Sequence, residues 1–129
     1  MKKLYFMSII LLLVTISLNA ASQSRVKLVK NTQINEYTNA ILGYTTVAKS
    51  CGHTNAFNKL KPRLIQLLGI ANKKNSLTKD GKNLLNNTNY YISIGVDEFN
   101  RKPYITCDEA TKYYKTLISS IDPIINANK

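Results

Sequence analysis

The chain has 129 residues, and 18 lysines and arginines against 7 acidic residues give it a formal net charge of +11. Its length fits one domain with a small core rather than several domains. The positive balance favours an acidic partner or an anionic surface. One histidine and a few scattered carboxylates form no cluster with metal-ligand spacing, so we expect no metal and no cofactor.

The N-terminus has the pattern of a secretory signal peptide. Lys2 and Lys3 precede an apolar run over residues 4–18, and the small residues Ala20 and Ala21 follow. This order predicts a signal peptide over residues 1–21, cleaved after Ala20 or Ala21. An uncleaved anchor is the alternative, but the run is shorter than the roughly 20 residues that cross a bilayer. We expect residues 22–129 to form one helical domain in a bacterial periplasm, with secretion as the alternative.

The first predicted helix begins near residue 32 and runs to about Ser50. Apolar positions recur at alternating intervals of three and four, which is the period of one helix face. Asn31 or Thr32 is the expected N-cap, and Cys51-Gly52 the expected end. Residues 22–30 are predicted to be a loose polar leader. The apolar face consists of Ile34, Tyr37, Ile41, Tyr44, Ala48 and Cys51.

A second helix is predicted from a cap at Thr54, and a polar loop over residues 72–76 follows it. Pro62 lacks an amide donor and is expected to kink this helix or to begin a new one. The expected apolar face consists of Phe57, Leu60, Leu64, Leu67 and Ala71.

A third helix is predicted from Thr78 to about Phe99. Gly81 and Gly95 share its apolar face, which indicates close approach of a neighbouring element. The expected apolar face consists of Leu84, Thr88, Tyr91, Gly95 and Phe99, widened by Leu85 and Ile92. The residues 90–96 are rich in β-formers, so a strand is the alternative there.

The last helix is predicted to begin at about Thr106, and Pro123 is expected to bend or end it. Its apolar face repeats the alternation of the first helix, through Cys107, Ala110, Tyr114, Leu117, Ile121 and Ile124. The chain as a whole is predicted to be all-α, a small bundle of about four helices.

The two cysteines are predicted to form a disulfide. Cys51 closes the first apolar face and Cys107 opens the last one, so a bond would tie the two helices antiparallel. A catalytic Cys51 with His53 as its base is the alternative, but His53 lies only two residues away and is expected to be solvated. Because no catalytic motif is present, we expect a protein that is not an enzyme.

Four lysines surround the predicted loop between the second and third helices: Lys73, Lys74, Lys79 and Lys82. They predict an electrostatic surface for an acidic partner, and a merely solvated face is the alternative. Nucleic acid does not fit a periplasmic location. An acidic protein, anionic lipid headgroups or cell-wall polymers fit it better.

The layout of residues 37–51 and 99–114, including Thr106-Cys107-Asp108, resembles a known family. It is similar to the small helical periplasmic immunity proteins that neutralise type VI secretion amidase effectors. The resemblance implies a binding protein that plugs a hydrolase, and residues 72–82 would be the protruding loop. The alternative is an envelope-associated stress or assembly factor that binds lipid or cell wall through a basic face. Acid-stress chaperones share this outline but are richer in carboxylates.

Overall fold

The computed structural model describes residues 26–129, and the signal peptide predicted for residues 1–21 lies outside them. The all-α prediction is confirmed for the described part of the chain. Its helices are α2 (Thr32–Ser50), α3 (Thr54–Lys73), α4 (Lys79–Asn86), α5 (Thr88–Arg101) and α6 (Cys107–Ala127). No helix within these residues is long and apolar enough to cross a membrane.

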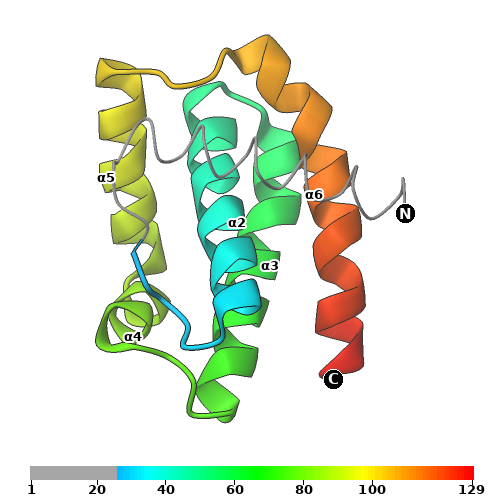
Figure 1. Cartoon of the computed structure of the whole chain (residues 1–129). Helices are drawn as coiled ribbons and strands as arrows, with labels where there is room; N and C mark the ends of the chain where they lie inside the picture. The colour runs from blue at the N-terminus through cyan, green and yellow to red at the C-terminus, as the bar shows by residue number, and fades with distance from the viewer. Residues whose placement is uncertain (1–25) are drawn as a thin grey trace.

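Helix α2 is the centre of the bundle (Figure 1). It packs against α3, α5 and α6, and α3 also packs against α6. Burial on α2 therefore extends beyond the single predicted face and includes Thr45 and Thr46. Their hydroxyls donate hydrogen bonds to the carbonyls of Ile41 and Leu42, four residues earlier. These bonds allow polar side chains to lie in the core without an unpaired donor.

Side-chain caps begin three of the helices, and the sequence predicts the first of them, at Asn31 or Thr32. The side chain of Asn31 accepts a hydrogen bond from the Ile34 amide at the start of α2. Thr78 caps α4 and Thr106 caps α6 in the same way. The cap predicted at Thr54 is wrong, because Thr54 is already the first residue of α3 and His53 occupies the cap position without a side-chain bond.

The predicted third helix is two helices, with a break at Asn87. The backbone of Asn87 is not helical, at φ −135° and ψ 43°. The break lets the two halves pack on different partners. A Cβ on Gly81 of α4 would lie 2.1 Å from the Leu28 carbonyl oxygen, and one on Gly95 of α5 would lie 2.8 Å from the Thr46 side chain. The close approach predicted at both glycines is confirmed, and the strand alternative for residues 90–96 is wrong.

Pro62 and Pro123 both lie inside continuous helices. Helix α3 passes through Pro62 to Lys73, so a new helix beginning there is excluded. Helix α6 passes through Pro123 to Ala127, so the helix does not end at this proline. In each case buried residues lie on both sides of the proline, such as Ile121 and Ile125 in α6. Their burial offsets the lost backbone hydrogen bond.

The segment 26–30 is anchored rather than loose. Leu28 and Val29 are buried, and their amides donate to the Asn35 side chain at 2.7 and 3.0 Å. Val29 also forms an antiparallel bridge with Leu77. The prediction of a loose leader is therefore wrong for these residues, and the segment joins α2 to the turn between α3 and α4.

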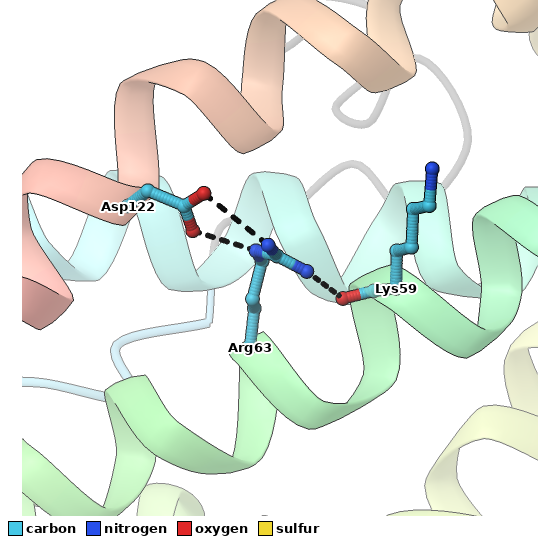
Figure 2. A network of polar contacts seen from close by, with 3 residues as sticks. All are labelled: Lys59, Arg63 and Asp122. Atoms are coloured by element: carbon cyan, nitrogen blue, oxygen red, sulfur yellow. Dashed lines mark hydrogen bonds and ion pairs between the residues drawn. The ribbon is translucent and has the colours of Figure 1, made fainter.

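An ion pair joins α3 to α6 (Figure 2). The Arg63 Nε donates to Asp122 Oδ1 at 2.6 Å and its Nη2 donates to Asp122 Oδ2 at 3.2 Å. The remaining Nη1 donates to the Lys59 carbonyl at 2.8 Å. These bonds favour the charged carboxylate, so the hydrogen bond from Arg63 lowers the pKa of Asp122 below its ordinary value of 3.8.

We expect Asp122→Asn to lower the free energy of unfolding by less than about 1 kcal/mol at pH 7, because the carboxylate is partly exposed. A depressed pKa gives stability that is present above the pKa of the unfolded chain and is lost as pH falls through the folded value. The difference between wild type and variant should therefore be full at neutral pH and shrink below about pH 4. Urea denaturation at several pH values measures it.

A double-mutant cycle with Arg63→Gln provides the control for this ion pair. The coupling energy between the two positions should show the same pH dependence. A difference that stays constant from neutral to acidic pH would contradict the role assigned to the ion pair.

Candidate functional site

One end of the bundle gathers exposed lysines from three parts of the chain. This end is where the turn between α3 and α4, the start of α2 and the end of α6 lie (Figure 1). We call this cluster the basic end. It consists of Lys27, Lys30, Lys73, Lys74, Lys79, Lys82 and Lys129, all of them exposed.

Backbone and side-chain hydrogen bonds hold these three parts together. The Lys30 amide donates to the Ser76 carbonyl at 2.8 Å, and the Thr78 amide donates to the Leu28 carbonyl at 3.1 Å. On the other side, the Lys74 Nζ donates to Asn128 Oδ1 at 2.5 Å. The four predicted lysines are thus joined by Lys27, Lys30 and Lys129.

The three added lysines were missed because only long-range pairing brings them here. Lys27 and Lys30 reach the cluster through the bridge between Val29 and Leu77, and Lys129 through the bond to Asn128. Neither pairing has a local signal in the sequence. The apolar residues of the segment 26–30 were the one hint that it is not a solvated leader.

The predicted protruding loop over residues 72–82 is instead a short, fixed turn. Lys73 belongs to α3, and Lys79 and Lys82 belong to α4. Between these helices Leu77 is buried, and Asn75 has a φ of 55°, a left-handed conformation that asparagine tolerates better than most residues. The lysines are therefore presented by helix ends and a pinned turn, and the prediction of a protrusion is wrong.

The charge at this end is strongly unbalanced. The segments 26–36, 72–82 and 124–129 contain the seven lysines and only two acidic residues, Glu36 and Asp80. Such a cluster attracts anionic groups through long-range electrostatics. Within residues 26–129, no group of three His, Cys, Asp or Glu residues could hold a metal ion.

The opposite end of the bundle carries the disulfide. Cys51 and Cys107 are bonded, with their Cα atoms 5.7 Å apart, as the sequence predicts. The alternative of a catalytic Cys51 thiol is therefore contradicted, because the sulfur is not free. The bond joins the C-cap of α2 to the first residue of α6.

His53 is half-buried beside the disulfide rather than solvated. Its Nδ1 lies 2.8 Å from the Tyr114 hydroxyl, and the two rings meet edge to face. Burial raises the pKa of Tyr114 to about 12, so the phenol stays protonated at neutral pH. The pair joins the start of α3 to α6, and this structural contact keeps His53 partly shielded from water.

The chain matches no protein-family model, no curated protein and no solved structure.

Proposed function

We propose that this protein is a non-enzymatic, exported binding protein whose basic end holds an acidic partner protein. An inhibitor or immunity protein that neutralises a secreted hydrolase would work in this way. The observation that carries the proposal is the gathering of seven exposed lysines at one end of the bundle. The disulfide supports an oxidising, exported location.

Rigidity of the basic end supports protein binding. Its turn is hydrogen-bonded to the segment 26–30, and Thr78 caps the start of α4. The backbone of the basic end therefore loses little conformational freedom when a partner binds. The lysines would steer an acidic surface toward the bundle and raise the association rate. Lys79 and Lys82 belong to the first turn of α4, whose backbone Thr78 caps through the Gly81 amide.

A second function is favoured by the same charge cluster. Anionic lipid headgroups or cell-wall polymers would also be attracted to the basic end, at about 1 kcal/mol for each lysine near a charged surface. The protein would then be an envelope-associated stress or assembly factor. The two functions differ in what the lysines bind: an acidic protein in the first, and lipid headgroups or cell-wall polymers in the second.

Charge reversal at the four predicted lysines tests the proposal. We expect Lys73→Glu, Lys74→Glu, Lys79→Glu and Lys82→Glu together to slow association with the protein captured from a periplasmic extract by at least about tenfold. The salt dependence of the association rate should fall as well, because fewer charges act at a distance. Stopped-flow measurements at several salt concentrations give both quantities.

The matched control changes four exposed lysines outside the basic end: Lys59, Lys102, Lys112 and Lys115. Their reversal alters the net charge by the same amount but should change the association rate much less.

Wild type should bind its partner at one-to-one stoichiometry without turnover. Equal effects of both quadruple variants would contradict a specific basic end. Salt-sensitive binding to envelope fractions, with no captured protein, would support the second function instead.

A further inference from the structure

The outer face of α5 is apolar and exposed. Tyr90 is 63% exposed, and Tyr91 and Ile94 are each 36% exposed. The prediction that Tyr91 lies on the apolar face that packs on the core is therefore wrong. The opposite face of the same helix is buried through Thr88, Ile92 and Phe99, and it faces α2. In Figure 1 α5 lies at the edge of the bundle, on the other side of α2 from α6. The exposed side chains thus point away from the bundle.

This face also differs from the rest of the chain in charge. No lysine or arginine occurs in residues 83–100, although the whole chain has 18 of them. Arg101, the last residue of α5, is exposed and lies on the same side of the helix as Ile94, seven residues earlier. The acidic residues Asp97 and Glu98 lie in this stretch and are exposed. Two copies of a protein with a net charge of +11 repel each other over most of their surfaces. Before Arg101, the α5 helix adds no positive charge to that repulsion, and Asp97 and Glu98 reduce it.

The positions on this face are self-complementary. Tyr90 and Asp97 are seven residues apart and lie on one flank of α5, because seven residues make nearly two helical turns. Tyr91 and Glu98 are also seven apart and lie on the other flank. Ile94 is midway between the members of both pairs. In an antiparallel pair of α5 helices with a two-fold axis at Ile94, each tyrosine would lie within about 2 Å of the level of a carboxylate of the other copy.

We propose that α5 pairs with α5 of a second copy, antiparallel about a two-fold axis at Ile94. The two Ile94 side chains meet at the axis. The Tyr90 hydroxyl donates to Asp97 of the other copy, and the Tyr91 hydroxyl donates to its Glu98. The contact is isologous, as in most homodimers. Tyrosine suits such a surface because its ring supplies apolar area and its hydroxyl a hydrogen bond.

The pairing leaves the basic ends accessible. Because the two α5 helices are antiparallel, the basic end of one copy points opposite to that of the other. The lysines stay apart, and the dimer carries two separate basic ends. One helix per copy buries less than the roughly 800 Å² per partner of a standard interface, so we expect a dissociation constant in the micromolar range or weaker.

Cross-linking through a new cysteine tests the geometry. Ile94→Cys in the oxidised protein should form a covalent dimer in air or with oxidised glutathione, because the two side chains meet at the axis. Ile65→Cys is the matched control, since Ile65 is a similarly exposed isoleucine (39%) on α3. It should stay monomeric at the same concentration. Peptide mapping checks that Cys51 and Cys107 remain paired with each other.

Mixed cross-links test the register. Tyr90→Cys mixed with Asp97→Cys should give more covalent heterodimer than Tyr90→Cys mixed with Glu98→Cys, because only the first pair shares a flank. Analytical ultracentrifugation of the wild-type protein at concentrations up to about 1 mM should show a dimer. Ile94→Glu should abolish this dimer, and Ile65→Glu should leave it unchanged. A wild-type protein that stays monomeric at that concentration would overturn the proposal. So would a dimer that Ile94→Glu leaves intact, or cross-linking equal at positions 94 and 65.

Discussion

Replacing Cys51 and Cys107 together by serine is expected to lower the free energy of unfolding by about 4 kcal/mol. The two cysteines are 56 positions apart, so their bond closes a long loop and removes much of the freedom of the unfolded chain. A domain of this size is stable by only about 5–15 kcal/mol, so this loss is a large share of the total. The midpoint of thermal unfolding should fall by roughly 15 °C or more.

Urea denaturation followed by circular dichroism measures the loss, and a thiol reagent checks its cause. The wild-type protein should show no reactive thiol until it is denatured and reduced, whereas Cys51→Ser alone should leave Cys107 reactive. Reduced wild type is the control, because it should match the double serine variant in stability. A loss below about 1 kcal/mol would show that the bond contributes little beyond the packing of α2 and α6.

Leu117→Ala is the second change with a large expected effect, a loss of about 2–5 kcal/mol. Leu117 lies in α6 and is buried in the core shared with α2 and α3. Truncation removes apolar contact and leaves a cavity, because the surrounding helices can relax only partly. Equilibrium unfolding in urea gives the change directly.

Two exposed positions serve as controls for this core truncation. Ile65→Ala removes a comparable apolar side chain at the surface of α3, and Lys112→Gln changes an exposed residue of α6. Both should cost less than about 1 kcal/mol. Similar losses at Leu117 and Ile65 would mean that the face of α6 has been assigned wrongly.

Local signals predicted much of the bundle. Helical periodicity identified the buried positions Ile41, Leu117 and Ile121, because side chains three and four apart share one face whatever the partner is. Helix starts near Thr78 and Thr106 were predicted as well, and each threonine caps its helix by accepting from an amide three residues away. All of these interactions lie within one turn or one helix.

Features that depend on distant contacts were predicted poorly. Helix propensity does not reveal the break at Asn87, which separates the half that packs on Leu28 from the half that packs on Thr46. Pro62 and Pro123 break helices in isolation, but here buried neighbours on both sides keep the helices continuous. In each case the gain from tertiary packing exceeds a local preference of a few kcal/mol.

The candidate site divides in the same way. The sequence by itself determined the positive charge, the pairing of Cys51 with Cys107 and four lysines that are neighbours in the chain, because composition and local spacing are properties of the sequence. Only the tertiary structure decided that Lys27, Lys30 and Lys129 join them, and that Tyr90 and Ile94 remain at the surface. Both outcomes depend on which elements pack against each other. Local composition and periodicity do not specify contacts between residues that are distant in the chain.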